Sequence, residues 1–300
     1  MAVAKEDIYP KKLLDYMEGF MVSKTLFTAC ELGVFDHLHA SEHPLTAEEV
    51  AQELGTNKDG TERLLSACVG LELLISRLNE KGEVVYSNTE MSTMFLTKSS
   101  PQSLYHSIKY YSNTIYLSWH YLNDAVREGT NQYEKAFGVS SKDLFKALYR
   151  SEEEMVKFMQ LMNSIWNVCG RDVISAFNLS HFRSICDLGG DFFKDDLPEA
   201  NLYILARILH DWADDRCIEL LNKVYQACRP GGGVLVIESL LSEDKSGPLS
   251  TQLYTLNMLV QTEGRERKAS EYTHLLNAVG FRDTHIHMTG KLYHSILARK

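Results

Sequence analysis

Polar and glycine residues stand directly after three short apolar segments in the C-terminal half of the chain. Asp187–Gly190 follows the first segment, His210–Trp212 the second, and Glu238 the third. Glycine lets a backbone approach a nucleotide-like ligand closely, and imidazole titrates near neutrality, so these residue types suit ligand binding and proton transfer. Each signal is weak alone, because Asp-x-Gly-Gly also marks a tight turn and a single histidine after a strand is usually an ordinary surface residue.

The sequence around these residues alternates between short apolar runs and helical periodicity. The apolar runs predict strands at 182–188, 202–205, 234–237, 283–288 and 294–298. Helical spacing covers 215–228 and 270–279, and we expect Pro230–Gly233 to end the first helix and Gly280 the second. This alternation predicts a doubly wound α/β sheet, whose ligands bind beyond the carboxyl ends of its strands. We therefore expect the polar residues to share one site.

The N-terminal part is predicted to be mainly helical. Apolar residues recur at helical spacing over 11–32, with Pro10 before the first turn and Gly33 after the last. They cover more than one stripe of this helix, which favours burial of one face by a partner chain. The alternative is a long core helix within a single chain.

A winged-helix pattern follows. Thr46–Glu49 is a capping box that begins a short helix, a second helix follows, and predicted strands at 75–78 and 83–87 are joined by a four-residue loop. Many such modules bind DNA through the second helix, but here Lys58 and Arg63 are offset by acidic neighbours. Dimerisation is the better interpretation. We predict a helical winged-helix dimerisation domain at 1–112 and the sheet domain at 113–300.

Further helices are predicted at 105–138 and 141–178, at the junction of the two domains. Glu152–Glu154 suits the first turn of a helix, where the helix dipole favours negative charge. The apolar stripe that includes Tyr149 and Trp166 is, on its own, more often part of a core than of a ligand pocket.

Composition narrows the function classes. The chain has 31 Lys and Arg against 40 Asp and Glu, a net charge of -9, so nucleic acid is a poor partner. The six cysteines form no C-x-x-C pair, no signal peptide is visible, and no apolar run approaches the ~20 residues of a membrane span. His285 and His287 lack a nearby acidic or thiol partner at ligand spacing, so we expect no metal site. We predict a cytoplasmic protein with no membrane partner.

Several motifs resemble those of the small-molecule O-methyltransferases that use S-adenosylmethionine as cofactor. The motifs are Asp187–Gly190, Asp191–Phe193, Leu209–Trp212, Pro230–Gly233 and Gly264–Arg267, and the resemblance extends through Phe20–Ser23, Leu256–Gly264 and Ile296–Lys300. The resemblance implies a winged-helix dimerisation domain followed by a Rossmann-like methyltransferase domain. It further implies a homodimer that transfers a methyl group to the hydroxyl of a hydroxyindole, N-acetylserotonin, giving melatonin.

The resemblance also assigns roles to individual residues. His210 is implied as the general base, with Glu238 and Glu266 flanking and orienting it, because imidazole can remove a hydroxyl proton near neutrality. Asp211, Asn257 and Gln261 are implied to hold the substrate, and the two amides stand four residues apart, on one face of a helix. The residues implied to bind the cofactor are Tyr149, Trp166, Asp187, Gly189, Gly190, Asp191, Phe192 and Arg207.

One departure from the family pattern lies just after the first strand. Only thirteen residues, 189–201, separate Leu188 from Leu202, whereas the family places three helical crossovers and two strands there, which need about 40 residues. The lost segment would include most of the Gly-rich loop, its helix and the acidic residue that binds the ribose. Loss of that carboxylate alone would weaken cofactor binding roughly 10- to 150-fold.

The shortened sheet leaves three interpretations open. The first is an active methyltransferase. The second is a shortened variant, from a skipped coding segment or a defective gene model, that dimerises but binds the cofactor poorly. The third, a winged-helix DNA-binding regulator, is disfavoured by the acidic charge. In a shortened sheet we expect the strand at 182–188 to neighbour the strand before His210 and to have an uncovered edge.

Overall fold

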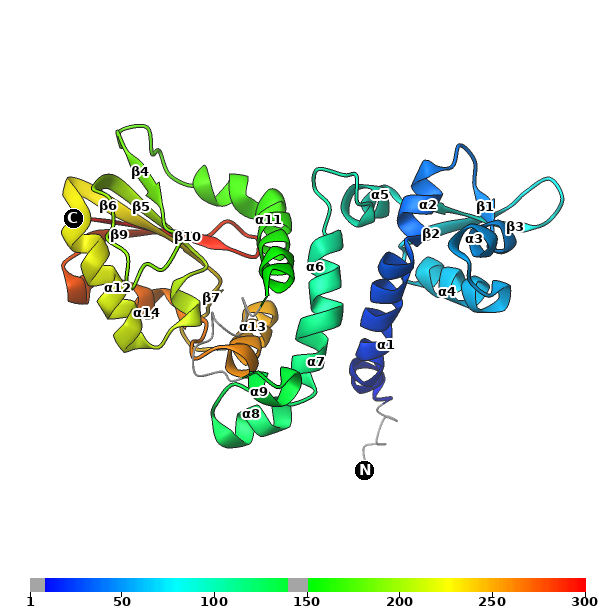
Figure 1. The fold of residues 1–300 in the computed structure, drawn as a ribbon, viewed down its shortest axis with the longest axis horizontal. Helices are drawn as coiled ribbons and strands as arrows, with labels where there is room; N and C mark the ends of the chain where they lie inside the picture. Colours follow the sequence, from blue (N-terminus) through cyan, green and yellow to red (C-terminus); the bar gives the residue numbers. More distant parts are fainter. Residues whose placement is uncertain (1–8, 140–150) are drawn as a thin grey trace, which may run out of the picture. The chain divides into compact units, whose positions relative to one another are not determined.

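The computed structural model describes residues 9–139 and 151–300. The chain forms two compact units, Met1–Asn113 with Lys157–Ser164 and Thr114–Val156 with Ile165–Lys300. Figure 1 shows the order of helices and strands along the chain. In the part of the chain that the structure describes, no helix is long and apolar enough to cross a membrane.

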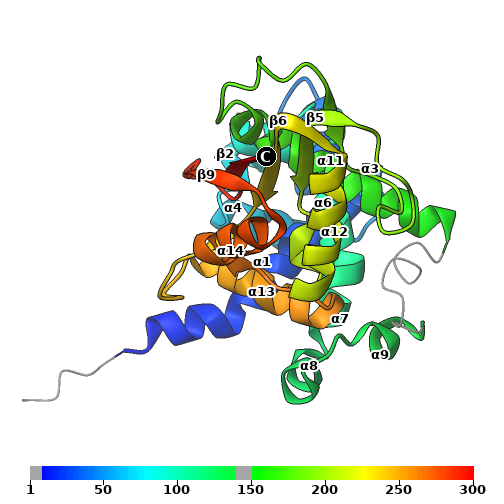
Figure 2. The same cartoon turned by 90° about the vertical axis from the view of Figure 1, so that its left-hand side faces the viewer.

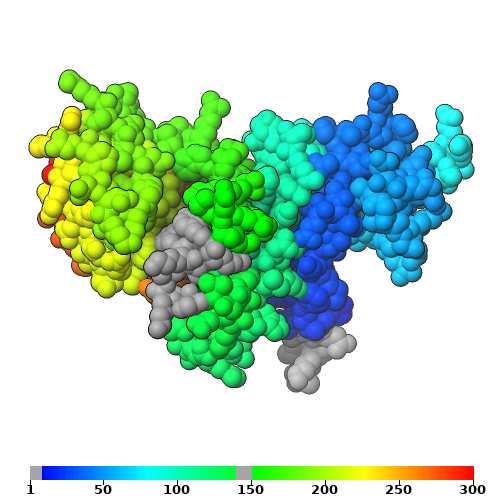
Figure 3. Space-filling model, in the orientation of Figure 1, coloured from blue at the N-terminus to red at the C-terminus, as the bar shows by residue number. Residues whose placement is uncertain are grey.

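Helix α1 (Lys11–Leu32) begins and ends as the sequence predicts, and Gly33 ends it with a left-handed φ of 82°. Figure 3 shows it, in dark blue, along the surface of the first unit. Much of its apolar side-chain area is exposed: Leu13 is 62% exposed, Met17 69% and Phe20 54%. The alternative of a core helix within one chain is therefore wrong for most of α1.

The first unit contains the predicted winged helix. Its helices are α2 (Val34–Ala40), α3 (Ala47–Leu54), α4 (Lys58–Gly70) and α5 (Glu90–Leu96), and its antiparallel sheet has the order β1 (Leu45–Thr46), β3 (Val84–Asn88), β2 (Leu74–Leu78). The predicted capping box at Thr46 and Glu49 is present. Strand β1 was not predicted, because two residues carry no periodicity. The unit packs around one apolar core that includes Phe35, Leu65 and Cys68.

The segment 105–138, predicted to be helical, is a series of short helical pieces. The chain forms α6 (Tyr105–Tyr110), a π-helical turn (Tyr111–Ile115), α7 (Tyr116–Trp119), α8 (Leu122–Glu128) and α9 (Tyr133–Phe137). The left-handed Gly129 ends α8 and Gly138 ends α9, so backbone conformation interrupts the apolar periodicity. The described part of the predicted 141–178 helix is α11 (Glu152–Ile174), which has the acidic first turn that the sequence indicates.

The second unit is built on a mixed five-stranded sheet. Its order is β4 (Ile185–Asp187), β5 (Ala200–Ala206), β6 (Cys228–Glu238), β10 (His294–Arg299), β9 (Arg282–His287), with the first three parallel and the last two antiparallel to their neighbours. Helices α12 (Asp214–Ala227) and α14 (Ala269–Val279) pack on one face, against Val234 and Val236 (Figure 2). The C-terminal part of α11 packs on the other, against Leu235 and Ile237. Side chains alternate along β6, so both faces are apolar.

Strands β4 and β6 differ in length from the predicted strands. Strand β4 is shorter than the predicted 182–188. Strand β6 is longer than the predicted 234–237, because it includes Pro230–Gly233, the segment expected to end the preceding helix. A Cβ at Gly232 would lie 2.4 Å from the Asn201 carbonyl, and one at Gly233 would lie 2.4 Å from that of Ala298. These glycines let neighbouring strands approach closely. A Pro-Gly-rich segment read from sequence alone indicates only the end of a helix, not this close approach.

The junction at residues 189–201 is folded without a helix. Strand β4 pairs directly with β5 and lies at the edge of the sheet, as predicted, and Ile185 is 51% exposed. The Lys223 ammonium, from α12, donates to the carbonyls of Phe192, Phe193 and Asp195 at 3.0, 3.3 and 2.7 Å. Lys223 therefore fixes the short connection to the helix beside it.

Candidate active site

His210 lies in a single 3-10 turn (Leu209–Asp211) that follows β5. The turn begins after Arg207, whose φ of 57° is rare for a residue other than glycine. Leu209 is fully buried and anchors the turn in the core, while His210 is only 3% exposed. The imidazole is therefore held inside the protein, at the carboxyl end of a parallel strand.

Glu238, the last residue of β6, binds the backbone of this turn. Its Oε1 accepts hydrogen bonds from the peptide N–H groups of Ile208, Leu209 and His210 at 3.1, 2.9 and 3.4 Å. Its Oε2 lies 3.8 Å from His210 Nδ1. Glu238 is fully buried, so its charge acts on the ring through a medium of low polarity. One carboxylate thus both fixes the turn and faces the imidazole.

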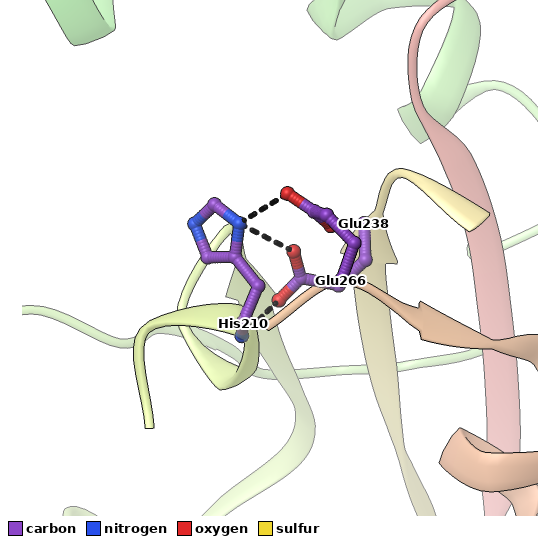
Figure 4. Close-up of side chains that lie close together, drawn as sticks. All are labelled: His210, Glu238 and Glu266. Atoms are coloured by element: carbon purple, nitrogen blue, oxygen red, sulfur yellow. Dashed lines mark hydrogen bonds and ion pairs between the residues drawn. The ribbon is translucent and has the colours of Figure 1, made fainter. Parts of the chain in front are cut away.

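Glu266 makes the direct bond to the imidazole. Its Oε1 lies 2.9 Å from His210 Nδ1, and Figure 4 shows both carboxylates beside this ring nitrogen. A carboxylate can only accept here, so Nδ1 carries the proton and Nε2 is left as the basic nitrogen of the neutral ring. Nε2 lies 3.6 Å from Oδ1 of Asp211. The predicted residues His210, Glu238 and Glu266 are brought together in this site.

Charges around the imidazole control its protonation. Burial alone would lower the pKa of His210, but the negative charges of Glu238, Asp211 and Glu266 outweigh burial and raise the pKa to about 9. Burial also raises the pKa of Glu238 and that of Asp211, against the attraction of the His210 cation. The site therefore stabilises an imidazolium, which is the state that a general base reaches when it has taken a proton.

The three donor atoms of His210, Glu238 and Glu266 lie within 4.8 Å of one another, a spacing that a metal ion can also use. All three side chains already have partners: Glu238 Oε1 accepts from three peptide N–H groups, and His210 Nδ1 donates to Glu266 Oε1. The geometry is that of a histidine oriented by a carboxylate, so we base the function on proton transfer.

Asn257 and Gln261 lie on α13 (Leu249–Gln261), one turn apart, as the spacing predicts. Gln261 Nε2 donates to Asn257 Oδ1 at 2.6 Å, and the Trp119 indole N–H donates to the same oxygen at 2.9 Å. The indole contact fixes the Asn257 side chain, and it was not predicted, because 138 residues separate the two positions. The substrate-binding role of both amides stays a prediction.

Some predicted cofactor residues gather after β4. Asp187 is the last residue of the strand, Gly189 and Gly190 follow, and Gly190 has a left-handed φ of 80°. Burial raises the pKa of Asp187. A Cβ at Gly189 would meet no atom within 4 Å, which leaves room beside the strand end.

The other predicted cofactor residues are more scattered. Trp166, on α11, is 37% exposed and stacks on Gly170, where a Cβ would lie 2.6 Å from the ring. Asp191 pairs with Lys194 at 2.6 Å, and Phe192 is buried in the main core. Tyr149 lies outside the described residues. The cofactor roles of these residues stay predictions.

Two residues near Glu266 received no role from the sequence. Gly264 packs against the His210 turn, and Arg267 is fully buried beside it. A single sequence does not show that Gly264 has no room for a side chain. Arginine is ordinarily a surface residue, so the burial of Arg267 is not predicted either. Strand β8 (Arg267–Lys268), which pairs with β7 (Leu240–Leu241), holds this segment beside the end of β6.

Comparison with known proteins assigns the chain to a family. The O-methyltransferase domain family matches residues 119–191 and 188–282, and the O-methyltransferase dimerisation domain family matches 14–98. The chain is 55% identical to chicken acetylserotonin O-methyltransferase, over 98% of this chain and 99% of the relative. The chain belongs to the acetylserotonin O-methyltransferase family. The human enzyme of this family is 47% identical over 99% of each chain.

A solved structure of this family agrees with the fold. The crystal structure of human N-acetylserotonin methyltransferase in complex with SAM superposes with a TM-score of 0.96, at 47% identity, over 100% of this chain and 99% of that one. The predicted fold class, a helical dimerisation domain followed by a methyltransferase α/β domain, is thus confirmed.

The comparisons also locate the shortened segment. The alignment with the chicken relative runs over 343 positions against 300 residues in this chain, so at least 43 positions lack a counterpart here. The two pieces of the O-methyltransferase domain match meet at 188–191. This split agrees with the internal deletion predicted after Gly190, and which elements are lost there stays a prediction.

Proposed function

We propose that this chain transfers a methyl group from S-adenosylmethionine to the 5-hydroxyl of N-acetylserotonin, giving melatonin. The observation that carries the proposal is the buried His210 imidazole, bound at Nδ1 by Glu266 and faced by Glu238. Membership of the family supports both the reaction and its substrate. The three residues are not interrupted by the deletion, because they lie after it in the chain.

The proton step follows from the geometry. A phenol-like hydroxyl is almost wholly protonated near pH 7, so its oxygen is a weak nucleophile. His210 Nε2 accepts the hydroxyl proton, and Glu266 and Glu238 stabilise the resulting imidazolium. General-base removal of a proton contributes about 10²- to 10⁴-fold to a rate. S-adenosylmethionine, when bound, supplies a methyl group on a sulfonium sulfur.

Three further residues are proposed to hold the substrate. Asp211 lies next to His210, and its Oδ1 is 3.6 Å from Nε2, on the side of the ring where the hydroxyl must approach. Asn257 and Gln261 present an amide pair suited to the acetamide of N-acetylserotonin. We propose that Asp211 orients the hydroxyl and the two amides orient the acetamide.

The residues present fit only part of S-adenosylmethionine. Asp187, Gly189, Gly190 and Arg207 remain at the strand ends beside the His210 turn, where polar groups of a ligand would bind. Strand β4 is at the open edge of the sheet, so no strand beyond it carries the acidic residue that a dinucleotide-type site uses for the ribose. We propose that these four residues hold the cofactor and that its adenosine moiety is bound much more weakly than in a complete site.

The reduced cofactor site at the open β4 edge also favours a second function. A chain with an intact dimerisation domain and a reduced cofactor site would act as a catalytically impaired variant that sequesters full-length partners. The open β4 edge and the missing segment support this alternative. It and the first function differ in one measurable quantity, the affinity for the cofactor.

We propose a homodimer in the cytoplasm. The matched dimerisation family and the exposed apolar residues of α1 support self-association. All six cysteines are free and five are buried, which suits a reducing compartment.

Methyl transfer to N-acetylserotonin, measured as melatonin by chromatography at millimolar S-adenosylmethionine, tests the proposal. We expect product from the unaltered chain and a loss of at least about 10²-fold in His210→Gln, with little change in cofactor binding. Absence of product from the unaltered chain, with no heat on titration of millimolar cofactor, would support the impaired variant. Retained turnover in His210→Gln would remove His210 from its role.

A further inference from the structure

Arg267 is a fully buried arginine that binds the turn carrying His210. Its Nη1 donates to the carbonyl of Leu209 and its Nη2 to that of Trp212, both at 2.7 Å. These two carbonyls lie at either end of the turn. The Leu209 carbonyl also accepts from the Trp212 peptide N–H at 3.3 Å, and the Cys217 thiol lies 3.2 and 3.6 Å from the two carbonyls. The guanidinium adds a charged donor to each of these carbonyls.

The arginine is itself held by one carboxylate. Asp214, at the start of α12, accepts from Nε of Arg267 at 2.9 Å and from Nη2 at 2.7 Å. A guanidinium presents its donors in a fixed planar fork, so binding to Asp214 also sets the direction in which Nη1 and Nη2 point. The turn is therefore fixed to α12 and β8 through one side chain.

Gly264 restrains the turn from another direction. A Cβ at this position would lie 2.0 Å from the carbonyl oxygen of His210, 2.4 Å from the carbonyl carbon of Asp211 and 2.5 Å from the Trp212 nitrogen. Backbone atoms cannot yield as a flexible side chain can. Only glycine therefore lets residues 210–212 lie where they do.

Glu266, the partner of the imidazole, stands between Gly264 and Arg267 in the chain. The segment 264–267 thus makes three kinds of contact with the turn: backbone packing at Gly264, the bond to Nδ1 at Glu266, and two carbonyl bonds at Arg267. Movement of the turn relative to this segment would alter the distance between Nδ1 and Glu266.

We propose that Gly264 and Arg267 are positioning residues for the general base, which hold residues 209–212 so that the His210 ring meets Glu266. This inference rests on the proposed function, in which His210 removes the substrate proton. The hydrogen bonds of Arg267 are to Asp214 and to backbone carbonyls, so it acts on His210 through the turn. Its effect should therefore appear in the properties of His210 and in kcat, with little effect on KM.

Arg267→Met and Arg267→Lys in the full chain test the proposal, with Arg265→Met as the matched control. Arg265 also binds Asp214 but is partly exposed, and its guanidinium bonds in the described part of the chain are to Asp214 and Glu271, not to the turn carbonyls. The first readout is the titration of the His210 ring by NMR on histidine-labelled protein, with the signal assigned by its loss in His210→Gln. The second is kcat and KM for N-acetylserotonin.

We expect the titration midpoint of His210 to fall by at least about one pH unit in Arg267→Met and kcat to fall about 10- to 100-fold, because small displacements of a catalytic group cost this much. Arg267→Lys should recover part of both, since one ammonium cannot replace the fork. Arg265→Met should match the unaltered chain. An unchanged midpoint in both Arg267 variants would overturn the proposal.

Gly264→Ala keeps the test decisive if Arg267→Met does not fold. This variant retains every charge but forces the turn away, so the His210 midpoint should fall in the same direction; an unchanged midpoint would count against the proposal. The titration is independent of turnover. If the unaltered chain shows no methyl transfer, the proposed function fails while the positioning of His210 by Arg267 is still measured.

Discussion

At the residue scale, the function depends on the charge state of one imidazole. Two carboxylates and Asp211 hold the pKa of His210 at about 9, so the free chain carries mostly imidazolium near neutrality. The neutral, basic form is then about 1% of the total at pH 7. The site favours the product of proton transfer and keeps little of the reactive base at neutral pH.

The first prediction concerns the dependence of the rate on pH. Because the base must be neutral to accept a proton, kcat/KM for N-acetylserotonin should rise with pH, about tenfold per unit from pH 7 to 8, and level off near the pKa of His210 of about 9. Initial rates at fixed cofactor concentration from pH 6 to 10 measure this. A profile that is flat or falls between pH 7 and 9 would contradict the assignment.

The second prediction concerns the charge of Glu266. Glu266→Gln keeps the size of the side chain but removes its negative charge, so the pKa of His210 should fall and kcat should drop at least about tenfold. Glu263→Gln, an exposed neighbour, is the matched control. Equal kcat values in the two variants would show that Glu266 does not stabilise the imidazolium.

At the element scale, the short junction after β4 depends on contacts that local sequence does not encode. Thirteen residues, 189–201, separate Leu188 from Leu202, and the Lys223 ammonium binds three of their carbonyls. Phe193 packs against Trp212 at 4.8 Å between ring centroids, so the junction also contacts the end of the His210 turn. The junction is therefore held in place by side-chain packing and hydrogen bonds, while β4 stays at the open edge of the sheet.

The third prediction concerns Lys223. Lys223→Met leaves three carbonyls without this charged donor and should lower the free energy of unfolding of the second unit by about 1–3 kcal/mol. Urea denaturation followed by the fluorescence of the tryptophans measures it. Lys245→Met, an exposed lysine of the same unit, is the control and should change stability by less than about 0.5 kcal/mol. Equal midpoints would show that the junction is held by other contacts.

The sequence predicts correctly those helices and turns that are determined by nearby residues. The extent of α1 and the capping box at Thr46 and Glu49 follow from spacing and end residues alone. The π-helical turn at Tyr111–Ile115 does not, because helical periodicity persists through it. The sequence predicts only that Pro230–Gly233 ends a helix. Its place in β6 is not predicted, because the close approach of β5 and β10 to β6, which requires glycine, is set by tertiary structure.

For the site, the family motifs supplied the residues but not their contacts. His210, Glu238 and Glu266 could be chosen from the sequence, yet the binding of Glu238 to three peptide N–H groups depends on residues 28–30 positions away. Arg267 was missed because its partners Leu209 and Trp212 are more than 50 residues away and its burial has no local signal.

At the scale of the whole molecule, the chain retains the dimerisation domain and the His210 site, whereas its cofactor-binding region is reduced. Several large apolar side chains of α1 are exposed, and self-association through this helix would bury them. The open edge of β4 is a different surface and is a liability for aggregation.

The fourth prediction concerns the dimer. Replacing Met17 and Phe20 of α1 together by lysine should convert a dimer to a monomer, because burial of two charges at an apolar interface opposes association. Size-exclusion chromatography with light scattering measures the mass. Lys12→Glu, an exposed charge exchange on the same helix, should leave the dimer intact. A dimer that persists in the double variant would place the interface elsewhere.

The most direct test is the initial rate as a function of S-adenosylmethionine concentration at saturating N-acetylserotonin. The same measurement is made on the chicken relative for comparison. It tests both the general base His210 and the reduced cofactor site. We predict a measurable plateau reached only at much higher cofactor, with KM raised at least about 10-fold, as expected from loss of hydrogen bonds to the ribose. No product up to several millimolar cofactor, or a KM equal to that of the relative, would contradict this account.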